Sequence, residues 1–388
     1  MDRFPAWMEV NLDAMKWNID RVREFMKKDV AILLVVKADA YGHGSVRIAR
    51  LAAECGIDML GVATVDEGKE LREAGVKLPI LVLSPVLPEE IVHALQYDLA
   101  VTVSSFEFAR AASETAASQG RTCRVHLEVD TGMGRAGLSR ENAVDRIAEI
   151  AKLEALDIEG IFTHFPASDS DMDFSREQIE SFNELLGGLE ARGIRFPYVH
   201  TANSAAILNY EASHFNMVRP GLLIYGHMPS IHLAGKVEVV PVMSFRTKLV
   251  LVREMPPGAS ISYGRTYIAP EHITMGIIPV GYGHGMSHRL SNRGEVLFRG
   301  SRVPIIGRVT MDMTMVDLSG FEDPRVGEEV VIFGRQGEKE ISVDEIAQWE
   351  GTLNYEILCR ISKRVARLYL LKGKVESLKT LLGMHEHS

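Results

Sequence analysis

Short apolar runs and longer segments of helical periodicity alternate along the first 236 residues of the chain. The apolar runs are rich in Val, Ile and Leu, as strands buried on both faces are. They lie at 31–37, 58–63, 80–83, 99–103, 124–129, 156–162, 196–200 and 215–218. The segments between most of them have apolar residues three and four positions apart, which predicts helices at 45–55, 66–74, 105–119, 140–152 and 174–191.

Eight strands with intervening helices over roughly 200 residues predict a (β/α)8 TIM barrel. The competing arrangement is an open, doubly wound sheet. That fold would normally have a GxGxxG turn after its first strand, and the run at 31–37 is not followed by one. We therefore predict an α/β fold class, with an N-terminal barrel over residues 12–236.

The pattern changes after the barrel, where strand-like runs are broken by glycine and proline. This pattern predicts a C-terminal, mostly β domain over residues 237–388, with helices at 343–349 and within 354–367. The opening strand, within residues 1–11, could join either part, and we assign it to the β domain. The tail after residue 371 is expected to be frayed, with its two histidines in solvent.

Composition and charge narrow the class of protein. The 388-residue chain is 46% hydrophobic and 24% charged, which is typical of a soluble globular protein. Its formal net charge of −9 argues against a nucleic-acid partner. No apolar run reaches the ~18 residues that span a bilayer, and the N-terminus lacks the regions of a signal peptide. We therefore expect a cytoplasmic protein without a membrane partner.

The three cysteines are Cys55, Cys123 and Cys359, and none lies in a CxxC pair. This spacing predicts reduced thiols, with neither a disulfide framework nor a zinc site. We expect no metal in this protein.

Polar residues gather at the C-terminal ends of the predicted strands, where barrels of this kind carry their functional side chains. Lys37 ends the first strand. The later strand ends carry "DTGMGRAG" (130–137), "THFPASD" (163–169), "HTANSAA" (200–206) and "VRPGLLIYG" (218–226). Five polar clusters on one rim are hard to explain by core packing alone. Taken by itself, Lys37 would be expected to be an exposed rim lysine.

These motifs, with "SYGRTY" (262–267) and "GRVTMDM" (307–313), resemble those of the alanine racemase family. Each motif alone is weak, but their order and spacing match over about residues 1–370. The resemblance implies a pyridoxal 5'-phosphate enzyme that interconverts L-alanine and D-alanine and supplies D-alanine for peptidoglycan. It also implies a homodimer in which the β domain contributes to the partner subunit's active site.

The resemblance assigns a two-base mechanism to Lys37 and Tyr263. Lys37 would form the internal aldimine with the cofactor and, once freed, act as one base. Tyr263 of the other subunit would serve the opposite face of the planar intermediate. Tyrosine is a weak base at neutral pH, so His164 is expected to support Tyr263 and link it to Arg219. Without the family, Tyr263 could equally be a turn residue and His164 a satisfied rim histidine.

Three further residues have supporting roles by the same resemblance. Arg219 would hydrogen-bond the pyridine nitrogen and, because a guanidinium accepts no proton, keep that nitrogen unprotonated. Arg135 would bind the phenolic oxygen of the cofactor and the substrate carboxylate. The family often has a carbamylated lysine where this chain has Glu128, and we predict a Glu128–Arg135 pair.

The remaining matches concern the cofactor phosphate and the entry to the site. An "NSA" turn opening a short helix would favour an anion. The implied phosphate contacts are Tyr41, Ser204, Gly221, Leu222 and Tyr355. Met311 and Asp312 would be lent across the dimer interface toward the substrate, and Tyr282 would line the entry. Two departures leave substrate preference open, namely His284 for an acidic residue and Thr310 for a cysteine.

Several alternatives remain on the sequence alone. A serine or broad-specificity amino-acid racemase of the same fold is the closest. A decarboxylase on the related plan would want an acidic partner for the pyridine nitrogen, and Arg219 argues against it. A pyridoxal-phosphate carrier would be a single barrel without the β domain that holds Tyr263. A metal-dependent barrel hydrolase is disfavoured, because no paired-histidine motif ends a strand.

Overall fold

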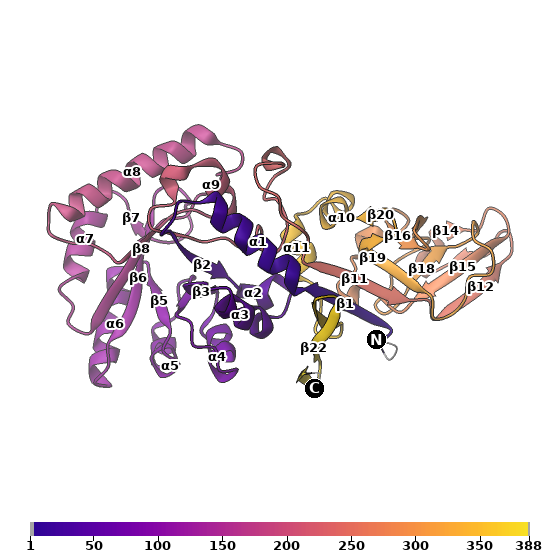
Figure 1. Cartoon of the computed structure of the whole chain (residues 1–388), viewed down its shortest axis with the longest axis horizontal. Coiled ribbons are helices and arrows are strands. Elements are labelled where there is room, and N and C mark those ends of the chain that lie inside the picture. Colours follow the sequence, from indigo (N-terminus) through magenta and orange to yellow (C-terminus); the bar gives the residue numbers. More distant parts are fainter. Residues whose placement is uncertain (1–3, 387–388) are drawn as a thin grey trace. The chain divides into compact units, whose positions relative to one another are not determined.

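The computed structural model describes residues 4–386 and divides into two compact units. The barrel unit consists of Met15–Ala40 and Ser45–Val240, and the β unit consists of the chain up to Ala14, Tyr41–Gly44 and the chain from Pro241 on. Figure 1 shows most of the barrel unit in indigo to magenta and most of the β unit in orange to yellow. Each unit is described by itself.

The barrel unit contains a closed sheet of eight parallel strands, as predicted. The order β5-β4-β3-β2-β10-β9-β8-β6 closes through the pairing of β5 with β6. Each predicted apolar run coincides with one of these strands to within two residues at either end, and the side chains of the strands are mostly buried. The strands are β2 (Ala31–Val35), β3 (Met59–Val62), β4 (Ile80–Val82), β5 (Ala100–Val103), β6 (Cys123–Asp130), β8 (Leu156–Phe162), β9 (Tyr198–His200) and β10 (Met217–Val218).

One helix precedes the first barrel strand, and the others follow barrel strands in sequence. They are α1 (Leu12–Phe25), α3 (Ser45–Glu54), α4 (Val65–Glu73), α5 (Ile91–Gln96), α6 (Phe106–Ser118), α7 (Ala143–Ile150), α8 (Met172–Glu190) and α9 (Ser204–Asn209). All five predicted helices are present, and α1 and α5 were not among them. Side-chain N-caps begin several of these helices, for example Thr64 at α4 and Ser105 at α6. The caps fix where each connecting loop ends, and therefore which residues remain on the barrel rim.

The β unit is built on one long, mixed sheet of order β17-β16-β19-β11-β1-β21-β22-β23. Strand β1 (Ala6–Asn11) pairs antiparallel with β11 (Met243–Lys248) and parallel with β21 (Ala366–Leu371), so the opening strand belongs to this sheet. The other strands of the path are β16 (Glu295–Phe298), β17 (Ser301–Pro304), β19 (Glu329–Gln336), β22 (Lys374–Thr380) and β23 (Gly383–Glu386).

Smaller elements complete the β unit. A three-stranded sheet joins β12 (Leu251–Met255), β15 (Ile273–Ile278) and β18 (Thr314–Asp317), and β13 (Ser260–Ile261) pairs with β14 (Tyr267–Ile268). Strand β20 (Lys339–Ile341) pairs with β19. The two predicted helices are α10 (Val343–Glu350) and α11 (Asn354–Cys359).

The expected fraying of the tail is wrong over the part that the structure describes. Strand β22 pairs with both β21 and β23. The turn between β21 and β22 contains Lys372 (φ 51°) and Gly373 (φ 72°), a pair of positive φ values that matches the twist of a two-residue hairpin. His385 is exposed on β23, as expected for a solvated histidine, and His387 lies outside the described residues.

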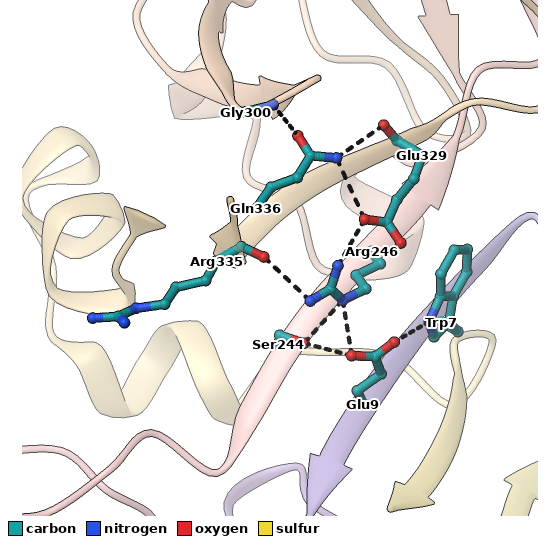
Figure 2. A network of polar contacts seen from close by, with 8 residues as sticks. All are labelled: Trp7, Glu9, Ser244, Arg246, Gly300, Glu329, Arg335 and Gln336. Atoms are coloured by element: carbon teal, nitrogen blue, oxygen red, sulfur yellow. Dashed lines mark hydrogen bonds and ion pairs between the residues drawn. The ribbon is translucent and has the colours of Figure 1, made fainter. Parts of the chain in front are cut away.

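Arg246 on β11 is the centre of a polar network across the long sheet (Figure 2). Its guanidinium lies 2.9 Å from Glu9 Oε2 on β1 and 2.7 Å from Glu329 Oε1 on β19. Its Nη2 donates to the carbonyl oxygen of Arg335 at 3.2 Å, and Trp7 Nε1 donates to Glu9 Oε1. One cation therefore ties three neighbouring strands together.

Replacing Arg246 with methionine is expected to lower the free energy of unfolding by about 1–3 kcal/mol, because two half-buried carboxylates lose their shared cation. Urea unfolding of the variant measures this loss. The matched control is Arg325→Met, since Arg325 pairs with Asp323 where both side chains are largely exposed. Such a pair contributes less than ~1 kcal/mol. Equal losses in the two variants would contradict the assigned role of Arg246.

Candidate active site

Lys37 begins an unusual left-handed turn directly after β2. Ala38, Asp39 and Ala40 all have φ of 54° and Tyr41 has φ of 51°. For non-glycine residues this conformation costs about 1–2 kcal/mol each, and it persists only where the surroundings hold it. Lys37 therefore lies between a buried strand and a strained turn. The turn fixes the position of this half-buried lysine.

Two carboxylates hold the turn in place. Glu67, in the first turn of α4, accepts from the Ala38 amide at 2.8 Å and from the Ala63 amide at 2.7 Å. Asp39 accepts from the Ser45 amide at 2.8 Å. Sequence reasoning missed Glu67, because nothing local distinguishes it from the other acidic residues that begin helices.

Arg219, just after β10, is buried and makes five hydrogen bonds. Its Nη1 donates to His200 Nδ1 at 2.8 Å and to the His200 carbonyl oxygen at 2.7 Å. Its Nη2 donates to the carbonyl oxygens of Thr163 (2.8 Å) and Thr201 (3.1 Å) and to His164 Nδ1 (3.2 Å). Burial lowers the pKa of Arg219 to about 10, so the guanidinium is still charged at neutral pH. Its Nε–H finds no acceptor within residues 4–386.

His164, after β8, is neutral in this structure. Burial, and then the positive charges of Arg219, Arg135 and Lys37, lower its pKa to about 3. Because Nδ1 accepts from Arg219, the ring proton must be on Nε2. The structure thus brings together the predicted His164 and Arg219, and it leaves His164 with a donor at its other nitrogen.

The predicted Glu128–Arg135 pair is not formed in the described chain. Glu128, on β6, is buried and accepts from Ser104 Oγ at 3.0 Å, whereas Arg135 is exposed. Burial raises the pKa of Glu128, while the Ser104 hydrogen bond and the charge of Arg135 oppose the rise. Asp130 holds the 130–137 turn by accepting from the Gly132 and Gly134 amides, which fixes the backbone that carries Arg135. A glutamate is shorter than the family's modified lysine and reaches the nearer hydroxyl.

Ser204 and the turn after Arg219 form a small cradle of donors. Ser204 Oγ accepts from the Gly221 amide at 3.0 Å and from the Leu223 amide at 3.5 Å. The amide of Leu222 is buried and has no acceptor among the described residues. Buried, unpaired amides are rare in folded proteins. The Leu222 amide and the unused Nε–H of Arg219 are both hydrogen-bond donors. Together they suit a ligand that carries an anionic group and a neutral hydrogen-bond acceptor.

In the β unit, Tyr41 and Tyr355 lie side by side with ring centroids 5.9 Å apart. Gly42 permits this approach, because a Cβ there would lie 2.3 Å from the carbonyl oxygen of Leu358 on α11. Burial raises the pKa of Tyr41, so its hydroxyl stays protonated and can donate.

Three loops of the β unit expose the other predicted residues. Tyr263 is 72% exposed, Met311 52% and Tyr282 48%. The Tyr282 amide donates to the Thr310 carbonyl oxygen at 3.0 Å, and Arg364 pairs with Asp312 at 2.8 Å. These contacts bring Tyr282, Met311 and Asp312 together on one surface.

The turn that carries Tyr263 is held by its own contacts. Ser262 has φ of 64° and Gly264 has φ of 70°, and Ser262 Oγ donates to the Arg308 carbonyl oxygen at 2.6 Å. This bond ties the turn to the 307–313 loop. Thr310 and His284, the two residues that depart from the family pattern, make local hydrogen bonds. Thr310 Oγ1 donates to the Met313 carbonyl oxygen and accepts from the Met313 amide. His284 Nδ1 accepts from the Gly281 amide.

Three buried histidines are expected to make the free energy of unfolding depend on pH. Burial lowers the pKa of His126 and of His164, and it lowers the pKa of His200 well below the ordinary value. All three are neutral when folded at pH 7, but they titrate near 6.5 when unfolded. Below that pH the unfolded chain binds more protons, so the free energy of unfolding falls by about 1.4 kcal/mol per pH unit for each histidine.

Urea unfolding at a fixed protein concentration is therefore expected to show the free energy of unfolding falling from about pH 6.5 toward pH 5, with each of these histidines adding to the slope. His126→Gln should reduce the slope. The control His232→Gln, at an exposed position, should leave it unchanged. A profile that is flat between these pH values would contradict the neutral, buried state of the three rings.

Metal-binding clusters and membrane-spanning helices are both absent from the described residues. No group of three or more His, Cys, Asp or Glu side chains could hold a metal ion within residues 4–386. Among the helices of that same range, none is long and apolar enough to cross a membrane.

The matches of the two units to known proteins define the class of the chain as an amino-acid racemase, which is an isomerase. Residues 10–229 match the family model "Alanine racemase, N-terminal domain", and residues 242–369 match "Alanine racemase, C-terminal domain". The chain belongs to the alanine racemase family.

Similar proteins cover almost the whole chain. The alanine racemase of Halothermothrix orenii is 43% identical over 372 residues, covering 96% of this chain and 98% of the relative. Alanine racemase 2 of Caldanaerobacter subterraneus subsp. tengcongensis is 41% identical over 380 residues, covering 97% and 98%.

Solved structures agree in fold. The alanine racemase of Clostridium difficile 630 superposes with a TM-score of 0.93 at 36% identity, covering 97% of this chain and 98% of that one. The alanine racemase of Bacillus anthracis with bound L-Ala-P gives 0.92 at 38% identity, with the same coverage.

Proposed function

We propose that this enzyme interconverts L-alanine and D-alanine by a two-base mechanism with pyridoxal 5'-phosphate. The observation that carries the proposal is the joint presence, at one end of the barrel unit, of a lysine fixed on a left-handed turn and a buried arginine with one unused donor. The relatives named above, which are called alanine racemases, support the substrate.

The residues present fit the cofactor. Lys37 would hold its aldehyde carbon covalently, and the unused Nε–H of Arg219 suits the ring nitrogen. The unpaired Leu222 amide and the Ser204 hydroxyl suit its phosphate. The other proposed contacts are Gly221, Tyr41 and Tyr355 for the phosphate and Arg135 for the phenolic oxygen. When bound, pyridoxal phosphate supplies an electron sink that acidifies the Cα–H of the amino acid.

Arg219 would limit how strongly the bound cofactor ring withdraws electrons. Its guanidinium can only donate, and five hydrogen bonds hold it in place. The ring nitrogen would therefore face a donor that cannot take up a proton and is not expected to give one up. This favours proton exchange at Cα over decarboxylation or transamination.

Two groups would move the Cα proton from opposite faces. The Lys37 amine would serve one face, and Tyr263 of the partner subunit would serve the other. The exposed Tyr263, on its positive-φ turn, is available to a second copy of the chain. The neutral His164 has its proton on Nε2 and would donate to the phenol oxygen, which stabilises the deprotonated form that acts as a base.

The β unit's exposed residues would complete the partner's site. Met311 and Asp312 would approach the substrate carboxylate, and Tyr282 would line the entry. We propose a homodimer on this ground. We also propose that the enzyme is cytoplasmic and that its D-alanine feeds peptidoglycan. We further propose that the barrel domain comprises residues 12–236 and that the β domain comprises residues 237–388 together with 1–11.

Incubating the purified protein and pyridoxal phosphate with L-alanine in deuterated water tests the function. The expected result is D-alanine carrying deuterium at Cα. Release of carbon dioxide, or the absence of exchange, would overturn the proposal. Running L-serine in parallel measures specificity, and comparable kcat/KM values for the two would favour the broad-specificity alternative.

A further inference from the structure

A chain of buried polar side chains leads away from Arg219 through the barrel. His200 on β9 lies beside Arg219, and its Nε2 is 2.8 Å from His126 Nδ1 on β6. His126 Nε2 in turn faces Glu159 Oε2 on β8 at 3.8 Å. Both imidazoles are fully buried, and the side chain of Glu159 is 19% exposed. The chain thus runs from a cation at one end to a carboxylate at the other.

The proton positions along this chain follow from Arg219. A guanidinium can only donate, so His200 Nδ1 must be the acceptor and the His200 proton is on Nε2. That proton is then donated to His126 Nδ1, which places the His126 proton on Nε2. This last N–H points to Glu159, and neither His126 Nε2 nor Glu159 Oε2 has a hydrogen bond within the described part of the chain. Every donor therefore points from Arg219 toward Glu159.

Packing fixes the two rings in this arrangement. His126 stacks on Tyr198 at 6.0 Å, and His200 stacks on Phe162 at 4.9 Å. Gly160, the strand neighbour of His126, leaves room for its ring, because a Cβ at Gly160 would lie 2.4 Å from His126 Nδ1. The rings cannot turn without displacing these neighbours, so the tautomers are set by geometry.

We propose that His126 and Glu159 are positioning residues, which act through His200 to hold the Arg219 guanidinium as a donor toward the cofactor ring. Neither residue would touch substrate or cofactor. If His126 is removed, His200 Nε2–H is left buried without an acceptor, and His200 can then take the other tautomer or turn away from Arg219. This inference rests on the proposed function for the role of Arg219, whereas the proton pattern stands on geometry alone.

The first test needs no cofactor and no activity. Nitrogen-15 NMR of the folded protein is expected to report both His126 and His200 as neutral Nε2–H tautomers from pH 6 to 8. An Nδ1–H tautomer or a charged ring at either position would overturn the proposal, whether or not the enzyme racemises alanine.

The second test compares His126→Leu with His214→Leu. His214 is also a buried histidine of the barrel unit, but its Nε2 bonds the Ile207 carbonyl oxygen and it has no link to Arg219. Both variants should lose stability. Only His126→Leu is expected to weaken pyridoxal phosphate binding and to lower kcat, each about tenfold, with little change in KM, and to shift the pH dependence of the cofactor absorption band.

Glu159→Gln provides a milder variant that keeps the size of the side chain. Glu159 also lies 3.7 Å from Arg124, so the control is Asp98→Asn, which removes the other carboxylate beside Arg124. Only Glu159→Gln should change the cofactor band and kcat. If the wild type racemises alanine and both histidine variants, or both acidic variants, give the same band and kcat, the positioning role is wrong. If the wild type does not racemise alanine, the proposed function fails while the NMR result still stands.

Discussion

Lys37→Ala is expected to reduce alanine racemisation by at least ~10⁴-fold. The substitution removes both the covalent anchor for the cofactor and one of the two proposed bases. Activity is measured as D-alanine formed from L-alanine. The absorption band near ~420 nm that reports the lysine–cofactor link should also disappear.

The control for this result is Lys69→Ala, which removes an exposed lysine of α4 that pairs with Glu73 at 3.9 Å and lies 5.5 Å from the centre of the Tyr97 ring. That variant should keep full activity and the absorption band. Thermal unfolding should show that both variants fold. Racemisation by the Lys37→Ala variant within tenfold of the wild-type rate would refute the assigned role of Lys37.

Tyr263→Phe is expected to lower racemisation by about 10²–10³-fold while leaving folding unchanged, because the side chain is mostly exposed in the single chain. Loss of one of two bases should affect the two faces unequally. In deuterated water, one isomer should still exchange its α-proton through Lys37, without inversion. Equal residual exchange of both isomers would argue against a two-base mechanism.

Mixing the Lys37→Ala and Tyr263→Phe subunits tests whether the active site is shared. If Tyr263 serves the partner, each mixed dimer contains one site with an intact Lys37 and an intact Tyr263. Random reassembly should then restore roughly a quarter of the wild-type activity. If every subunit used its own Tyr263, no mixture of the two variants would recover activity.

The elements that were predicted correctly from sequence are those whose pattern is local. A strand buried on both faces is continuously apolar, so 80–83 and 99–103 could be recognised without knowing what they pack against. Lys37, His164 and Arg219 were chosen as candidates because each lies within two residues of the end of such a strand. The hairpin after residue 371 was missed because β22 is half-buried and its sequence alternates weakly, although Lys372 and Gly373 mark its turn.

Other features of the site had no local signal. Glu67 binds the Ala38 amide from 29 residues away, and His126 meets His200 from 74 residues away. Glu128 could not be assigned to Ser104 rather than Arg135, since both choices satisfy a carboxylate. Such contacts depend on which strands become neighbours when the barrel closes.

The sequence by itself therefore determined the barrel, the following β domain and the rim residues, because hydrophobic period and strand ends are properties of neighbouring residues. Only the tertiary structure decided the direction of the protons from Arg219 to Glu159 and the left-handed turn behind Lys37. Hydrogen bonds act over about 3 Å and need a partner at a defined angle. That partner is chosen by the packing of strands far apart in the chain.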